Sequence, residues 1–155
     1  MVYSIEFQKR GLPHAHIVLF LDRDDKIQNP VDIDRFISAE LPDKEQHPML
    51  YALVTDLMIH GPCGSLNPRS PCMKDNKCAK FFPKRFNEET YVDGDGYPCY
   101  KRRDNGATVV KGANVIDNRY VVAHNPTLLL KYNAHINVID NGRRTTRFCR
   151  LDPQS

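Results

Sequence analysis

No segment of this sequence is long and apolar enough to cross a membrane as a helix. The strongly apolar run at residues 17–21 ends after five residues, whereas a membrane span needs about 20. The basic segment and apolar stretch that together mark a secretory leader are also missing. We therefore expect an intracellular protein with no membrane partner, and a nuclear one if it is functional.

A full set of disulfide partners is absent too. The sequence has five cysteines, an odd number, and disulfides persist mainly in the oxidising compartments that a leader would reach. Thiols or a metal site therefore explain these residues better than a disulfide framework does. They are Cys63, Cys72, Cys78, Cys99 and Cys149.

What is present is an ordinary globular composition. The chain has 155 residues, of which 41% are hydrophobic and 26% charged, so we expect one domain with a sizeable core. No internal repeat or low-complexity tract interrupts it. A strand pattern that already opens at residue 3 predicts that the N-terminus is cut inside a larger domain.

The charge is distributed unevenly. The net charge is only +3, but residues 69–86 carry six basic residues and one acid, while residues 22–45 carry eight acids and four bases. Four arginines also lie in residues 143–150. The mild total thus hides a basic surface of the kind that a polyanion partner uses, although solvated loop charges give the same pattern.

Hydrophobic periodicity predicts an α+β fold. Alternating residues around a turn with Gly11 and Pro13 indicate an N-terminal hairpin, and two stretches of helical spacing each begin near a proline. We expect a mostly antiparallel central sheet, two or three covering helices and a Cys/His-rich loop. The expected strands are residues 3–8, 14–21, 90–92, 97–103, 108–111, 120–123 and 135–139, and the expected helices are 30–41 and 48–58.

The first candidate site is the pair His14 and His16 in the second expected strand. Residues two apart on a strand point to the same face, so both imidazoles can hold one divalent cation. Glu6 or Gln8 on the neighbouring strand can supply an oxygen as the third ligand. Such a set leaves coordination positions open for water or a phosphate oxygen, as a catalytic site requires. The alternative is two histidines on a solvated sheet face.

The second candidate site is a cluster of metal-binding residue types in the loop after residue 60. One imidazole and three thiolates form a tetrahedral Zn²⁺ set, and this loop has almost no apolar core of its own. The spacings are wider than the CxxC pairs of common zinc fingers, so reduced, independent cysteines remain the alternative. The predicted structural zinc ligands are His60, Cys63, Cys72 and Cys78.

The same loop combines cations with aromatic rings. This combination suits contacts with the backbone and bases of single-stranded nucleic acid, although the phenylalanines would equally serve to pin the loop to the core. The predicted nucleic-acid-binding residues are Lys74, Lys77, Lys80, Phe81, Lys84 and Arg85.

Three blocks of the sequence resemble the Rep proteins of Helitron transposons, in the Helitron helicase-like N-terminal domain of the HUH endonuclease superfamily. The first block contains the two histidines and the second contains the cysteines. The similar segments are residues 5–16, then 58–64, 70–74 and 77–84, then 117–119, 125–126 and 128–138. The resemblance predicts a Rep domain over residues 1–139, cut at both ends, followed by a divergent basic tail over 140–155.

The resemblance implies an endonuclease that nicks single-stranded DNA and transfers the strand in rolling-circle replication. In the family, two histidines, here His14 and His16, hold Mg²⁺ or Mn²⁺ against the scissile phosphate, and a tyrosine attacks to leave a 5′-phosphotyrosine link. A phenol with a pKa near ~10 is a poor nucleophile at neutral pH. The cation therefore has to neutralise the charge that develops on the phosphate.

The nucleophile of the family has no counterpart here. Helitron Reps carry their tyrosines on a helix shortly after the strand that matches residues 135–138, and no tyrosine occurs after Tyr132. The helicase portion of the parent protein is missing as well. We therefore expect a truncated Rep domain that binds single-stranded DNA and divalent metal, with no catalytic tyrosine. The alternative is a non-enzymatic, zinc-stabilised nucleic-acid-binding module.

Overall fold

The computed structural model places most of the chain. It describes residues 1–7, 13–22, 25, 27, 29–139 and 147–152, with the backbone alone described for residues 13, 14, 139 and 147–152. Gln8, one of the two predicted oxygen ligands, lies outside the described residues.

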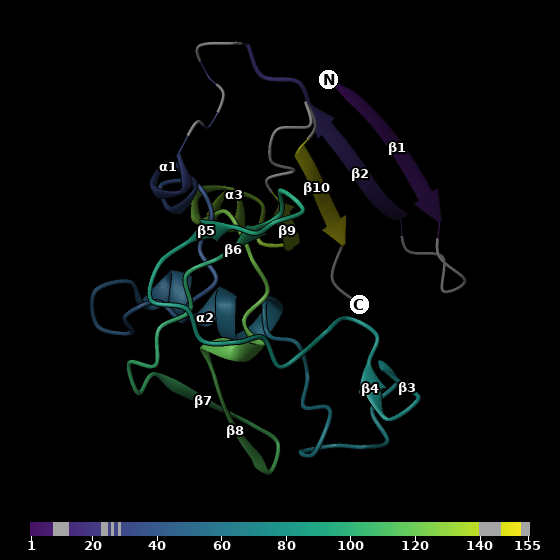
Figure 1. The fold of residues 1–155 in the computed structure, drawn as a ribbon, viewed down its shortest axis with the longest axis vertical. Coiled ribbons are helices and arrows are strands. Elements are labelled where there is room, and N and C mark those ends of the chain that lie inside the picture. Colours follow the sequence, from purple (N-terminus) through teal and green to yellow (C-terminus); the bar gives the residue numbers. More distant parts are fainter. Residues whose placement is uncertain (8–12, 23–24, 26, 28, 140–146, 153–155) are drawn as a thin grey trace.

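The largest sheet in the described chain has four antiparallel strands in the order β1-β2-β10-β9. β1 (Val2–Phe7) and β2 (Pro13–Leu19) form the predicted N-terminal hairpin, and β9 (His135–Ile139) is the predicted last strand. β10 (Arg147–Asp152) lies within the segment that we expect as a tail, and it pairs with both β2 and β9. Figure 1 shows the β1–β2 hairpin at one side of the molecule, next to β10.

Three α-helices lie in the described residues, and each has a proline in its first turn, where the missing N–H costs nothing. They are α1 (Pro30–Asp34), α2 (Pro48–Leu57) and α3 (Pro126–Tyr132). The prediction of α2 is confirmed, whereas a helix over 30–41 is wrong beyond Asp34. There the chain turns extended, because Ser38 exchanges two backbone hydrogen bonds of 2.9 Å with His124.

The other sheets in the described residues are three two-stranded hairpins: β3 (Met73–Lys74) with β4 (Lys77–Cys78), β5 (Tyr91–Val92) with β6 (Pro98–Cys99), and β7 (Thr108–Lys111) with β8 (Asn114–Asp117). The strand expected over 120–123 is wrong, because residues 118–120 form a 3-10 turn, η2 (Asn118–Tyr120), and Val121 makes only an isolated bridge to Ile59. The fold is therefore α+β, with small antiparallel sheets.

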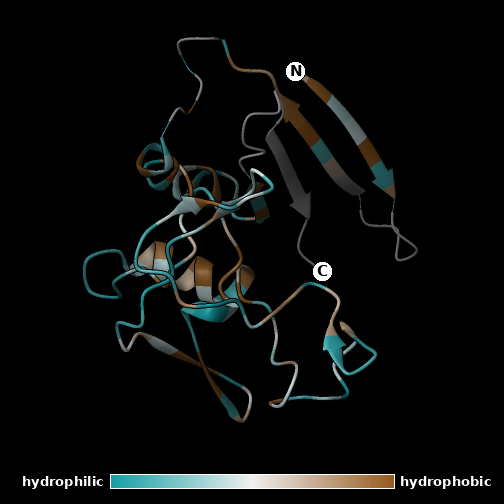
Figure 2. Ribbon diagram, in the orientation of Figure 1, coloured by the Kyte–Doolittle hydropathy of each residue, from teal (hydrophilic) through white to brown (hydrophobic). Residues whose placement is uncertain are grey.

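The core consists of three apolar clusters that join these elements. Ile33, Ile37 and Ile136 belong to the first, beside the large sheet. Val54 and Leu129 belong to the second, between α2 and α3, and Figure 2 shows the apolar segments of α2 in brown. The third contains Cys63, Cys78, Ile116 and Tyr120, so the cysteine loop is attached to the body of the protein rather than projecting freely from it.

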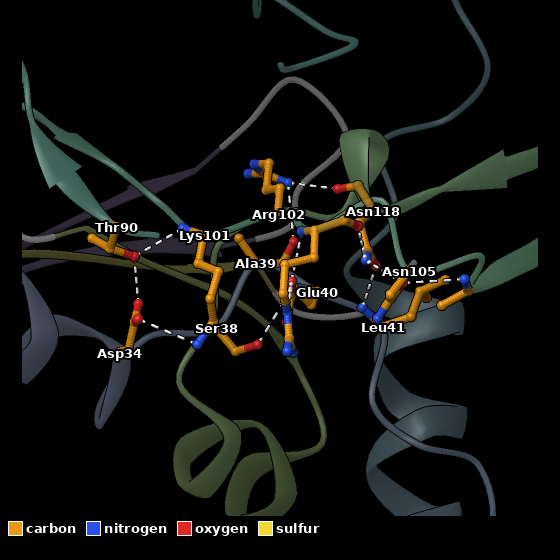
Figure 3. A network of polar contacts seen from close by, with 12 residues as sticks. Asp34, Ser38, Ala39, Glu40, Leu41, Thr90, Lys101, Arg102, Asn105 and Asn118 are labelled. Atoms are coloured by element: carbon orange, nitrogen blue, oxygen red, sulfur yellow. Dashed lines mark hydrogen bonds and ion pairs between the residues drawn. The ribbon is translucent and has the colours of Figure 1, made fainter. Parts of the chain in front are cut away.

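A buried cation organises the centre of the fold. Arg102 is only 5% exposed, and its Nη1 donates to the carbonyl oxygens of Ala39 (3.2 Å), Asn118 (2.8 Å) and Val121 (2.5 Å). Figure 3 shows its side chain beside Asn118. Burial lowers the pKa of Arg102 to about 10. Its acceptors lie on two segments, so the guanidinium fastens η2 and its neighbours to the chain after α1.

No helix in the described part of the chain is long and apolar enough to span a membrane, as the sequence predicts.

Candidate metal centre

The four predicted zinc ligands converge. One ligand atom from each of His60, Cys63, Cys72 and Cys78 lies within 4.8 Å of the other three, and Nε2 of His60 is 3.4 Å from Sγ of Cys78. Cys63 is fully buried and Cys78 nearly so. Four residues spread over nineteen positions of the sequence therefore form one cluster, large enough to hold a metal ion.

Local structure brings the ligands together. The β3–β4 hairpin turns at Asp75 and Asn76, whose φ angles of 49° and 61° are left-handed, a conformation that Asp and Asn tolerate better than most residues. The hairpin places Cys78 opposite Met73, and the N–H of Ala79 donates to the carbonyl of Cys72 at 2.8 Å. The two cysteines thus lie side by side at the open end of the hairpin.

The first two ligands are positioned from the body of the protein. His60 follows α2, and its N–H donates to the carbonyl of Tyr120 at 2.8 Å. Gly64, with a φ of 65°, turns the chain directly after Cys63, which a residue with a side chain does less readily. His60 and Cys63 are therefore fixed to η2 and the third core cluster, and the hairpin cysteines meet them there.

The donor set fits a zinc ion. With Zn–S bonds of about 2.3 Å, tetrahedral ligands lie roughly 3.8 Å apart, and the observed separations reach at most 4.8 Å. Three sulfurs and one imidazole nitrogen form one of the common structural zinc sets. A zinc ion at this position would connect four points of a loop whose only regular structure is the β3–β4 hairpin, so it would contribute directly to folding.

The electrostatics of the cluster differ from one ligand to the next. Burial and the neighbouring thiols raise the pKa of Cys63 to about 12. Burial also opposes ionisation of Cys78, but N–H groups of Phe82 and Lys80 stabilise the thiolate and lower its pKa. Burial, together with Lys80 and Lys84, lowers the pKa of His60 and keeps the imidazole neutral, as a ligand must be.

Residues around the ligands hold them in place. The ring of Phe82 stacks on the imidazole of His60, with centroids 4.2 Å apart and planes at 12°. The N–H of Lys80 donates to Sγ of Cys78 at 3.4 Å, and Oγ of Ser70 lies 3.3 Å from Sγ of Cys72. Such outer contacts orient metal ligands. The sequence predicts neither Ser70 nor Phe82 in this role, because adjacency to a ligand is their only signal.

The predicted nucleic-acid-binding residues lie in the same loop as this cluster or directly after it, and most of them are exposed: Lys74, Lys77, Lys80, Phe81 and Arg85. Lys84 differs from the others, because it is half-buried. Its Nζ lies over the rings of Phe81 (5.6 Å) and Phe82 (5.1 Å) and donates to the carbonyl of Lys80 at 3.1 Å. Burial, and then the charge of Arg102, lower the pKa of Lys84.

The predicted two-histidine site is described only in part. Glu6 lies opposite His14 in the β1–β2 register, and His16 lies opposite Ser4. Oε2 of Glu6 is 3.5 Å from Nε2 of His16, with the Glu6 side chain 68% exposed. The side chain of His14 lies outside the described atoms, as does all of Gln8. Of the four predicted ligands, the structure therefore describes a side-chain contact for one pair, Glu6 and His16.

Comparison with known proteins adds no family assignment to this geometry. No protein-family model matches the chain, and no curated protein matches it.

Proposed function

We propose that this chain is a domain of Helitron Rep descent that binds single-stranded DNA through a zinc-stabilised basic loop. Residues 133–155 contain no tyrosine in the position of the family's nucleophile. The observation that supports this most is the convergence of His60, Cys63, Cys72 and Cys78 within 4.8 Å. The similar sequence blocks support the descent, and the β1-β2-β10-β9 sheet is proposed as the counterpart of the family's central sheet.

The charge around the cluster supports a polyanionic partner. Residues 69–86 hold six basic residues and one acid, a net charge of +5. Lys74 and Lys77 face each other across the β3–β4 hairpin, and both are exposed. Cations on a rigid hairpin attract phosphates and release their counterions without first having to order a loop. The proposed role of the zinc is therefore to hold the basic hairpin in one shape.

The test measures metal content and DNA binding on the full chain. Purified protein should contain about one zinc per chain, the number that a single tetrahedral site holds, and should bind a fluorescein-labelled single-stranded oligonucleotide in an anisotropy titration. Cys78→Ser should lose both zinc and binding. Cys99→Ser is the matched control, because Cys99 lies outside the cluster, and it should lose neither. A zinc-loaded protein that does not bind the oligonucleotide would refute the proposal.

A second candidate function is a divalent-cation site on the β1–β2 hairpin, inherited from the endonuclease. The contact between Glu6 and His16, and the register of Glu6 with His14, favour it. There His14, His16 and Glu6 would hold Mg²⁺ or Mn²⁺, which in the family polarises the scissile phosphate. A second, Mn²⁺-exchangeable site that His16→Ala removes would support this function. Zinc alone would favour the non-enzymatic module, and a covalent adduct with nicked DNA would contradict the absence of the nucleophile.

A further inference from the structure

Phe81 has a backbone conformation that its side chain does not favour. Four non-glycine residues of the described chain have a positive φ: Asp75, Asn76, Phe81 and Asn133. Three of them are Asp or Asn, which tolerate the left-handed region, whereas a bulky residue there is an outlier. Phe81, with a φ of 59°, is the exception. A strained conformation of this kind persists only when the surrounding structure imposes it, and such sites are often functional.

Burial does not explain the strain. Phe81 is 79% exposed, the highest value among the described large hydrophobic side chains. A phenyl ring in water gains no stability from the hydrophobic effect. Phe81 therefore combines an unfavourable backbone conformation with an exposed apolar ring. Burial among the described residues explains neither feature.

The metal cluster holds Phe81 in this conformation. The N–H of Phe81 donates to the carbonyl of Cys78 at 2.9 Å, and the N–H of Lys80 donates to Sγ of the same cysteine. The next residue, Phe82, is stacked on His60. Ligands thus fix the chain on both sides of Phe81, so the exposed ring is carried on a rigid support.

One cation lies over the ring, and two more are close to it in the sequence. Nζ of Lys84 lies 5.6 Å from the centroid of Phe81, and Lys80 and Arg85 are exposed nearby in the sequence. An aromatic face beside positive charges is the arrangement that accepts an unpaired base together with its flanking phosphates. Duplex DNA offers the phosphates but keeps its bases stacked on one another, so it cannot use the ring.

We infer that Phe81 is a preformed stacking platform for one unpaired base, with Lys80, Lys84 and Arg85 meeting the adjacent phosphates. This inference rests on the proposed function and extends it, because it assigns the preference for single strands to one side chain. The cations supply affinity for any nucleic acid, and the ring supplies the distinction between single strand and duplex.

The test compares variants of Phe81 in the zinc-loaded full chain. Phe81→Ala should weaken binding to a single-stranded oligonucleotide about tenfold, within the range seen when a stacking aromatic is truncated. It should leave duplex binding, the salt dependence and the zinc content unchanged. Phe81→Trp should retain binding. A 2-aminopurine base in the oligonucleotide should lose fluorescence on binding to wild type and not to Phe81→Ala.

Two further variants separate stacking from folding. Phe81→Gly accepts the positive φ without strain, so it should keep zinc and thermal stability and still lose affinity for the single strand. Tyr132→Ala is the matched control. Tyr132 is 54% exposed and has Nζ of Lys131 5.3 Å from its ring centroid, but it lies on α3, outside the metal loop, so this variant should bind normally.

Each outcome bears on the inference. If Phe81→Ala binds single strands as wild type does, or if the Phe81 variants lose zinc together with affinity, the ring is not a stacking platform and the inference is wrong. Failure of wild type to bind DNA at all would instead refute the proposed function. Unchanged discrimination between single strand and duplex in Phe81→Ala would also overturn the inference while leaving the proposed function in place.

Discussion

Replacing Arg102 by methionine, which keeps most of its volume, should destabilise both the fold and the metal centre. Its Nη1 serves the carbonyls of Ala39, Asn118 and Val121, of which Asn118 keeps a second donor, the N–H of Val121 at 3.2 Å. The substitution leaves two buried carbonyls without a donor, at a cost of about 1 to 1.5 kcal/mol each, and a third carbonyl partly satisfied. The unfolding free energy should therefore fall by about 3 kcal/mol. This is a large part of a typical unfolding free energy of about 5–15 kcal/mol.

The effect should reach the metal ligands through η2. Within η2, the backbone carbonyl of Tyr120 accepts a hydrogen bond from the N–H of His60. The backbone carbonyl of Arg119 accepts one from the N–H of Lys84 at 3.0 Å. When Arg102 no longer fastens this turn, both positions become less constrained. We therefore expect the zinc affinity of Arg102→Met to fall as well, measured by competition with a chromogenic chelator.

Calorimetry gives the first measurement. A loss of about 3 kcal/mol corresponds to a Tm lower by roughly 6–12 °C for a chain of this size. Arg35→Met is the control, because its guanidinium is exposed and pairs with Asp32 at 3.8 Å, and such a surface pair contributes about 1 kcal/mol or less. If Arg102→Met melts within about 2 °C of wild type, the unfolding free energy has changed by less than about 1 kcal/mol. The buried guanidinium would then not stabilise the attachment of η2 to the chain after α1.

Three other predictions concern metal, salt and pH. Removing zinc with a chelator under reducing conditions should raise hydrogen exchange in residues 61–86 and leave α2 protected; uniform exchange would contradict a local role for the metal. Lys77→Glu and Lys80→Glu should each weaken single-strand binding and flatten the salt dependence by about 0.7 in slope for each phosphate that is no longer neutralised, and an unchanged slope would make these lysines ordinary surface residues. Burial lowers the pKa of His124 from 6.5 to about 4. Between these values the unfolded chain binds the proton and the folded chain does not, so stability is fully present above pH 6.5 and is lost as the pH falls to about 4. In urea titrations, His124→Asn should make the unfolding free energy less dependent on pH between 6.5 and about 4. An equal pH dependence in the variant and in wild type would refute the role of His124.

The ligands of the metal cluster could be predicted from the sequence because their chemistry is their signal. Three thiols and an imidazole in a loop with almost no apolar core of its own have few structural roles other than metal binding. The N-terminal hairpin could be predicted because the alternation along residues 3–8 is typical of a strand. The half-buried face that such alternation predicts is wrong, since every residue of β1 is exposed. In both places the information is local.

The predictions that are wrong concern residues whose conformation depends on distant partners. Ile37 has helical spacing from Ile33, but Ser38 pairs with His124 and ends the helix early. Asn118 has no strong local preference that indicates η2; its side chain accepts the N–H of Leu41 at 2.8 Å and donates to the carbonyl of Arg103 at 2.9 Å. A pattern within one segment does not contain these contacts.

The position of β10 has a consequence for how the molecule assembles. Because β10 separates β2 from β9, the N-terminal hairpin has no neighbour in the sheet until residues 147–152 have left the ribosome. Pairing between segments more than a hundred residues apart closes a long loop, and such topologies fold slowly. We therefore expect the metal loop and the helices to form first during synthesis, and the sheet to be completed last.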